Sequence, residues 1–191
     1  MEPVTLRTAR LELRSPTAED AQSIVDACQD PEIARWTVVP SPYGMEDAEK
    51  FIAVVSQSWA DGDECTWAIR RGGALVGMIG LHGISGNIDG GRAEIGFWIA
   101  PDARGQGVVA EAARAVIEWG FAHLDLARIE WRARAGNMAS AKTARSLGFR
   151  YEGLLRQAHA SPRGRDDAWI AGLLAHDDRS PGSWPIMNDT E

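Results

Sequence analysis

The sequence predicts a protein of the α/β or α+β class, with one domain built around a central mixed sheet. Segments whose apolar residues recur at helical spacing interchange with segments whose apolar residues recur at every second position, in the order β-α-α-β-β-β-α-β-α-β-β. The chain has 191 residues, of which 45% are hydrophobic, and this length suits one domain with a substantial core. We place the domain at residues 1–176 and expect a C-terminal tail at 177–191.

Composition narrows the function classes. The 20 Lys and Arg residues are outnumbered by 27 Asp and Glu residues, and the net charge of −7 argues against non-specific nucleic-acid binding and favours a cationic substrate. Cys28 and Cys65 form no C-x-x-C motif, so we expect neither a disulfide framework nor a metal site. We find no apolar run long enough to cross a membrane and no signal-peptide pattern, so we expect a cytoplasmic protein with no membrane partner.

The N-terminal third is expected to contain one strand and two helices. Apolar and charged residues alternate over residues 11–14, as in a half-buried strand. Thr17 and Asp20 have the spacing of a capping box, so we expect a first helix from there to near Pro31. A second helix, at about residues 46–61, has an apolar stripe formed by Ala48, Phe51, Ile52, Val55 and Trp59.

The rest of the chain is expected to hold six strands and two helices. Gly77 and Gly80, inside an apolar strand, indicate that another group packs closely against the backbone there. The residues from His176 onward have no apolar period and are expected to form a loosely packed tail. The expected elements are a hairpin of residues 65–69 and 74–81, a loop at 85–92, a buried strand at 93–100, the longest helix at 105–124, a strand at 126–133, a loop beginning at Asn137, a helix at 139–147 followed by Gly148, and strands near 149–155 and 168–174.

A glycine-rich segment at residues 104–110, RGQGVVA, separates the buried strand from the longest helix. Its glycines let a ligand approach the backbone, and the N–H groups of a first helical turn, together with Arg104, suit a pyrophosphate. The same spacing of glycines matches a dinucleotide-binding fingerprint, but that motif follows its strand directly and needs an acidic residue ending a second strand, whereas Glu130 lies inside one. A purely structural helix start is the third interpretation.

Two motifs stand at a characteristic separation. The first is R-G-Q-G after E-I-G-F-W-I-A-P, with A-E-A following on the helix, and the second is N-M-A-S-A-K-T-A-R-S-L-G-F-R-Y-E-G. Together they resemble the GNAT acetyltransferases, and specifically their RimJ/RimL-like branch. The resemblance covers about residues 5–175 and is most specific over residues 94–153. It implies a mixed sheet in which the strand ending at Ala100 and the strand starting at Leu126 splay apart around acetyl-CoA.

The resemblance also implies that acetyl-CoA binds without a metal, and it implies which residues hold it. The backbone of Ile99 and Ala100 would pair with the pantetheine arm like an added strand. Asn137 would bind the same arm, and Arg145 would reach a phosphate unless it is simply solvated. Val109 stands where many family members have Gly or Ala, a change that leaves its N–H group in place. The pyrophosphate would be held through backbone amides of Arg104, Gly105, Gln106, Gly107, Val108 and Val109.

Attack of an amine on a thioester needs a base, a stabilised oxyanion and an acid that returns a proton to the thiolate. Glu94 is the candidate base, because burial in an apolar strand would raise its pKa and its position matches a glutamate that serves as base in some family members. A structural ion pair with Arg92 or Arg132 is the alternative. His159, expected in a loop on the acceptor side, is the other candidate base. A backbone N–H at the end of the strand that carries Glu94 would stabilise the oxyanion.

The acid and the acceptor pocket are less directly indicated. Many family members use a tyrosine where this chain has Ala144, and in the RimL-like branch the serine of the second motif takes that role, which indicates Ser140. A helix-capping serine is the other interpretation, and Tyr151 is the alternative acid. Trp36, expected in the loop between the first two helices, is either a wall of the acceptor pocket or a plug of the core. Asp167 either lies in a solvated turn or attracts a cationic acceptor.

The sequence therefore predicts an acetyl-CoA-dependent N-acetyltransferase that transfers the acetyl group directly in a ternary complex. The resemblance implies a protein N-terminal amine as the acceptor, and a small amine such as an amino acid, polyamine or antibiotic is the alternative. A CoA-binding regulatory module without catalysis is the third interpretation, because the tyrosine is missing at Ala144. A homodimer formed through the C-terminal edge strands stays open.

Overall fold

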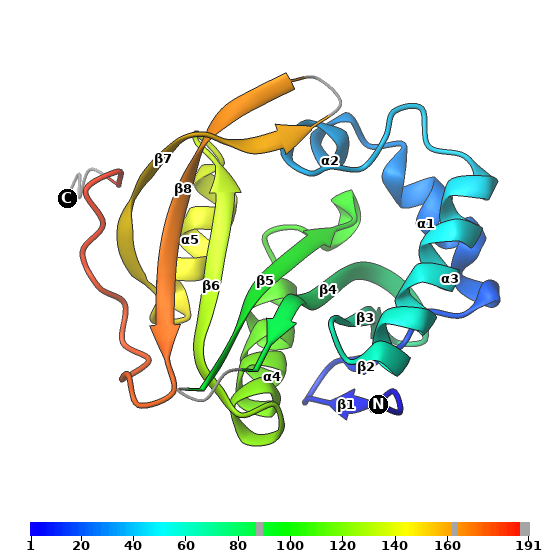
Figure 1. The fold of residues 1–191 in the computed structure, drawn as a ribbon. Coiled ribbons are helices and arrows are strands. Elements are labelled where there is room, and N and C mark those ends of the chain that lie inside the picture. The colour runs from blue at the N-terminus through cyan, green and yellow to red at the C-terminus, as the bar shows by residue number, and fades with distance from the viewer. Residues whose placement is uncertain (87–89, 162–163, 188–191) are drawn as a thin grey trace.

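The computed structural model describes residues 1–86, 90–161 and 164–187, which form one eight-stranded sheet with helices packed against both faces (Figure 1). The strand order is β1-β2-β3-β4-β5-β6-β8-β7, and every neighbouring pair is antiparallel except β5 and β6. The predicted mixed sheet is therefore confirmed. The strands are β1 (Leu6–Arg7), β2 (Glu12–Arg14), β3 (Cys65–Arg71), β4 (Ala74–Ser85), β5 (Gly91–Ile99), β6 (Leu126–Arg134), β7 (Arg150–Ser161) and β8 (Gly164–Leu174).

The helices divide the interior into two apolar clusters. Ile79 and Ile95 belong to the larger cluster beneath α4, whereas Met78 faces the smaller cluster beneath α1 and α3. Because side chains alternate along a strand, the central strands are buried on both faces. The helices are α1 (Ala21–Cys28), α2 (Pro31–Trp36), α3 (Met45–Asp61), α4 (Val108–His123) and α5 (Met138–Ser146), with short 3₁₀ turns at Ala18–Asp20 and Pro101–Ala103.

Strands β5 and β6 pair over only part of their length. Their parallel ladder runs from the pair of Gly91 and Leu126 to the pair of Ile95 and Trp131. Beyond that point β5 continues to pair with β4, and β6 continues to pair with β8. The two strands consequently diverge (Figure 1), which confirms the expected splay, and within the described residues no strand pairs with the β6-facing edge of residues 96–99.

The first half of the chain contains one helix and one short strand that the sequence analysis missed. Helix α2 occupies Pro31–Trp36, so Trp36 ends a helix and does not lie in a loop. Pro31 was interpreted only as the end of the preceding helix, but proline also suits the first position of a new one. Asp30 caps this helix, since its Oδ1 accepts a hydrogen bond from the Glu32 N–H at 2.7 Å. The missed strand is β1, which has only two residues.

Two helix boundaries also differ from the prediction. Helix α4 begins at Val108 and not at residue 105, because Gly105 and Gly107 have φ values of 71° and 72°, which are left-handed and incompatible with a right-handed helix. Asn137 does not start a loop. It caps α5, where its Oδ1 accepts a hydrogen bond from the Ser140 N–H at 3.2 Å. Part of the expected 85–92 loop, residues 87–89, lies outside the described residues.

Strands β7 and β8 are longer than predicted. The end of β7 toward Ser161 and the start of β8 at Gly164 extend past the body of the sheet, and we call this extension the β7–β8 arm (Figure 1). His159 pairs with Asp166 in this arm, so it lies in a strand and not in a loop. The expectation of a loosely packed tail is wrong for its described part. Trp184 is buried and donates a hydrogen bond from Nε1 to the Phe149 carbonyl at 3.1 Å. One large apolar side chain therefore outweighs the polar composition around it.

No helix in the described part of the chain is long and apolar enough to span a membrane.

Candidate active site

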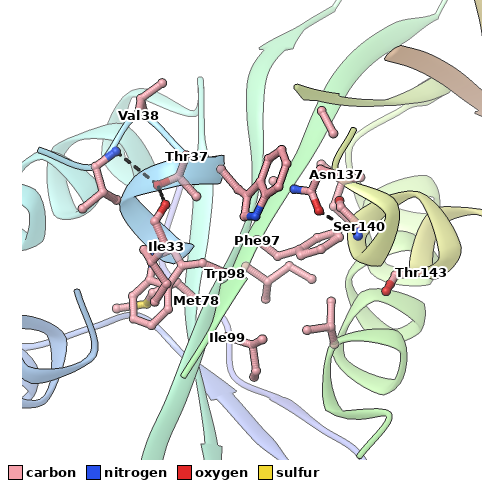
Figure 2. A pocket seen from close by; sticks show the side chains of 18 of the residues that line it. Ile33, Thr37, Val38, Met78, Phe97, Trp98, Ile99, Asn137, Ser140 and Thr143 are labelled. Atoms are coloured by element: carbon pink, nitrogen blue, oxygen red, sulfur yellow. Dashed lines mark hydrogen bonds between the residues drawn. The ribbon is translucent and has the colours of Figure 1, made fainter. Parts of the chain in front are cut away.

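A cavity of about 1170 Å³ opens where β5 and β6 part. Residues of both faces of β5 line it, so the cavity reaches both sides of the sheet. Figure 2 shows Phe97 and Ile99 on one wall, with Asn137, Ser140 and Thr143 on the wall made by α5. Helix α2, helix α3, strand β4 and the β7–β8 arm complete the lining.

The glycine-rich segment forms one end of the cavity. The Glu111 N–H donates to the Gly107 carbonyl at 3.1 Å at the start of α4, and the N–H groups of residues 108–110 precede this hydrogen bond. Val108 is buried in the core and fixes the first turn, whereas Val109 lines the cavity. Free N–H groups at the positive end of a helix dipole suit an anionic ligand such as a pyrophosphate.

Two arginines beside this segment were missed by the sequence analysis. Both guanidinium NH groups of Arg10 lie 3.3 Å from the Gln106 carbonyl oxygen, and Arg71 donates to Gln106 Oε1 at 2.6 Å. The Gln106 side chain also donates to the Asp102 carbonyl, so it is turned toward the protein. No sequence signal could have found these arginines, because only the pairing of distant strands brings them to the segment.

The two predicted cofactor arginines lie in different places. Arg104 lines the cavity, and one of its NH groups lies 2.8 Å from Asp30 Oδ2. Arg145 does not line the cavity. Its Nε donates to the Gly182 carbonyl at 2.7 Å, so its side chain holds the C-terminal segment against α5.

The backbone of β5 offers a polar edge next to the glycine-rich segment. The Ala100 N–H donates to the Val76 carbonyl at 2.9 Å, so this peptide group faces β4. Since peptide groups alternate in direction along a strand, those of Phe97 and Ile99 face the gap. Phe97 was not among the predicted residues. Asn137 stands across the gap and reaches into the cavity while its carbonyl oxygen caps α5 (Figure 2).

Glu94 lies on the cavity wall, on the same face of the sheet as His82, its partner across β4 and β5. Burial raises the pKa of the Glu94 carboxyl, and the guanidinium of Arg132, with Nε 3.6 Å away, partly offsets that rise. Arg132 also donates to Glu130 at 2.8 Å, so it is shared between two carboxylates. The structure therefore shows the arginine partner foreseen for Glu94, but the Glu94 side chain is 42% exposed to the cavity and is only partly buried.

Ser140 lies on the opposite wall, in the first turn of α5. Its hydroxyl oxygen accepts a hydrogen bond from Trp131 Nε1 at 2.9 Å. Since Asn137 provides the cap and a hydroxyl can donate while it accepts, the Ser140 proton is available to a group in the cavity. Tyr151 does not line the cavity. Its ring packs against Trp184, and burial raises the pKa of its phenol.

The far side of the cavity is formed by side chains from separate elements. Trp36 lines it while donating from Nε1 to Glu32 at 2.9 Å, and His159 lines it from the β7–β8 arm. Val38 and Val54 line it with 62% and 51% of their surface exposed, so they form an apolar rim. Asp167 does not line the cavity, and its carboxylate accepts a hydrogen bond from the Gln157 N–H at 2.9 Å.

Known proteins share this fold and sequence pattern. The family model described as acetyltransferase (GNAT) domain matches residues 10–150. The uncharacterized N-acetyltransferase p20 of Bacillus licheniformis is 30% identical over 172 residues, which cover 89% of this chain and 96% of p20. The crystal structure of a "Probable acetyltransferase" matches with a TM-score of 0.81 and 26% identity, covering 92% of this chain and 99% of the other. RimL, a ribosomal L7/L12 alpha-N-protein acetyltransferase in complex with coenzyme A, matches with a TM-score of 0.79 and 19% identity, covering 90% and 98%.

Proposed function

The chain belongs to the GNAT acetyltransferase family, and from that premise we propose that it transfers the acetyl group of acetyl-CoA directly to the α-amine of a protein N-terminus. The transfer takes place in a ternary complex without a covalent enzyme intermediate. The observation that carries the proposal is the cavity that reaches both faces of the sheet, with Glu94 and Ser140 on opposite walls. Such a cavity lets two substrates enter from different faces and meet.

In this proposal acetyl-CoA lies along the gap between β5 and β6. Its pyrophosphate accepts hydrogen bonds from the N–H groups of the glycine-rich segment, with Arg104 as a neighbouring cation. The exposed peptide groups of Phe97 and Ile99 and the side chain of Asn137 hold the pantetheine arm. Arg145 takes no part, because its side chain is turned to the C-terminal segment.

The proton transfers are assigned to the side chains of Glu94 and Ser140 on the two cavity walls. Glu94 accepts a proton from the ammonium group of the acceptor, and the neutral nitrogen attacks the thioester carbonyl carbon. A C–N bond forms and the C–S bond breaks. The Ser140 hydroxyl gives its proton to the departing thiolate and regains the proton that the attacking nitrogen loses. One proton per turnover leaves through Glu94.

The acceptor side supports a peptide acceptor. Its rim is apolar and open at Val38 and Val54, which suits a chain that continues beyond the amine and out of the cavity. Glu94 at the base of this side would attract the ammonium group. RimL, whose fold is similar, is described as an alpha-N-protein acetyltransferase.

Calorimetry with acetyl-CoA, followed by thiol release with a panel of acceptors, tests the proposal. The panel holds short peptides with a free α-amine, the same peptides with the α-amine blocked and lysine retained, and small amines including amino acids and polyamines. We expect acetyl-CoA binding, and turnover only with the free α-amine peptides. Turnover restricted to small amines would replace the peptide acceptor with a small molecule. Binding without turnover on the whole panel would support a regulatory module.

A further inference from the structure

We propose that His82, held in place by Glu64, relays the proton of the acceptor amine from Glu94 to solvent. The inference rests on the proposed function and adds two residues that lie outside both sequence motifs. Three observations carry it: a hydrogen bond that fixes the tautomer of the imidazole, two glycines that make room for its ring, and the position of His82 opposite Glu94.

The hydrogen bond with Glu64 determines which ring nitrogen is free to accept a proton. His82 Nδ1 lies 3.2 Å from Glu64 Oε2. An ionised carboxylate only accepts hydrogen bonds, so Nδ1 carries the hydrogen and Nε2 is the basic nitrogen of the neutral ring. This hydrogen bond holds the pKa of Glu64 below its ordinary value, so Glu64 is ionised at neutral pH.

The sheet backbone is shaped around the imidazole. Gly80 and Gly96 face each other across β4 and β5. A Cβ on Gly80 would lie 2.9 Å from His82 Nε2, and a Cβ on Gly96 would lie 3.1 Å from the same nitrogen. The basic nitrogen is thus held over two glycines that line the cavity. Gly96 is also the first residue of β5 beyond the last pair of the β5–β6 ladder, so the ring lies where the gap begins.

His82 and Glu94 form a cross-strand pair on the cavity side of the sheet. Side chains that face each other in this way lie within about 5.5 Å at Cβ, close enough for proton exchange directly or through one water. The side chains of His82 and Glu64 are 39% and 38% exposed, so the row Glu94, His82, Glu64 leads from the cavity to solvent. Other charged or titratable side chains of the site are Glu130 and Arg132 on β6, Asp47 and Lys50 on α3, Glu32 on α2, Tyr43 before α3, Arg104 in the glycine-rich segment, and His159 on the β7–β8 arm.

Every proton in the relay is accounted for without a further reactant. The ammonium proton moves to a Glu94 oxygen as the amine becomes neutral, and then to His82 Nε2, which restores the Glu94 carboxylate. The resulting imidazolium is stabilised by the Glu64 carboxylate and loses a proton to water. An imidazole accepts a proton at one ring nitrogen and donates from the other, which suits this role.

The pH dependence of kcat/KM tests the relay, using the acceptor that gives turnover in the panel. In the wild type we expect an acid limb set by the groups that must be deprotonated before the site can accept the ammonium proton. His82→Gln should lower kcat about 10–100-fold at neutral pH and change this limb, because Glu94 must then pass its proton to solvent without the imidazole. Glu64→Gln should change kcat and the acid limb in the same direction but by less, because the imidazole stays in place and loses only its charged partner. His123→Gln, at the exposed end of α4, is the matched control and should keep the wild-type profile.

Acetyl-CoA affinity and thermal melting of each variant separate a loss of folding from a loss of the relay. A folded His82→Gln enzyme with the wild-type kcat and acid limb would overturn the relay and leave the proposed function standing. A wild-type chain without turnover would overturn the proposed function instead. NMR spectra of the histidine side chains give a readout without turnover: we expect the Nδ1–H tautomer at His82, and the Nε2–H tautomer would overturn the relay.

Discussion

The two ends of the cavity are built in different ways. Under the proposed function, the cofactor end is one continuous segment, residues 104–110, and it offers backbone N–H groups set by two left-handed glycines. The acceptor end is assembled from side chains of α2, α3, β4, β5 and the β7–β8 arm. A continuous backbone motif can be identified from sequence and serves any acyl-CoA, whereas a surface assembled from distant side chains determines which acceptor fits. The chemistry of this protein is therefore easier to predict than its acceptor.

Glu94→Gln should give the largest effect and should separate the two ends most sharply. The amide cannot accept the ammonium proton, so we expect kcat/KM to fall about 100–1000-fold. The acetyl-CoA dissociation constant should stay unchanged, because the pyrophosphate is assigned to the backbone at the other end. Calorimetry and thiol release measure the two quantities. Glu118→Gln, on the exposed face of α4, is the control, and near-normal turnover of Glu94→Gln would remove the base from the proposal.

Gly107→Val should act on the cofactor end alone. A Cβ at this position has only an Arg10 nitrogen within 4 Å, at 3.8 Å, so the effect comes from the left-handed φ of 72° and not from a clash. That conformation costs a non-glycine residue about 1–2 kcal/mol, which we expect to weaken acetyl-CoA binding about 10-fold. Gly62→Val, at a φ of 78° after α3, carries the same strain away from the segment. Equal weakening in both variants would contradict the assignment.

Trp36→Ala should act on the acceptor end with a smaller effect. Loss of an aromatic wall is expected to raise the KM of the acceptor about five-fold, which corresponds to about 1 kcal/mol of contact energy. The acetyl-CoA dissociation constant should stay at the wild-type value. Steady-state kinetics with the best peptide of the panel check this, and an unchanged KM would place Trp36 among the structural residues.

Arg145→Gln should give the smallest effect on binding. Because Arg145 Nε bonds to the Gly182 carbonyl, we expect less than about a twofold change in acetyl-CoA affinity and a loss of about 1 kcal/mol in the free energy of unfolding. Arg104→Gln provides the comparison, since its side chain lines the cavity. A marked loss of affinity in Arg145→Gln would return this residue to the cofactor site.

The sequence predicts well what is local and periodic. The glycine-rich segment, the β4–β5 strands and α4 were found because apolar period and glycine position act within a few residues. Helix α2 was missed because Asp30-Pro31 is compatible with both the end and the start of a helix. Strands β7 and β8 were predicted to be shorter than they are, because the residues around His159 have no alternation of large apolar side chains. His82 was missed because its position opposite Glu94, on which the proposed role depends, is set by cross-strand register, which no motif contains.

Asp30 connects the two ends of the cavity. Its Oδ1 caps the helix that carries Trp36, at 2.7 Å from the Glu32 nitrogen, and its Oδ2 lies 2.8 Å from Arg104 beside the glycine-rich segment. Under the proposed function one carboxylate thus contacts elements of both substrate sites, and the two affinities are thermodynamically linked through it. Linkage is reciprocal, so the factor by which acetyl-CoA changes acceptor affinity equals the factor by which the acceptor changes acetyl-CoA affinity. An Asp30→Asn variant would bring that factor toward one.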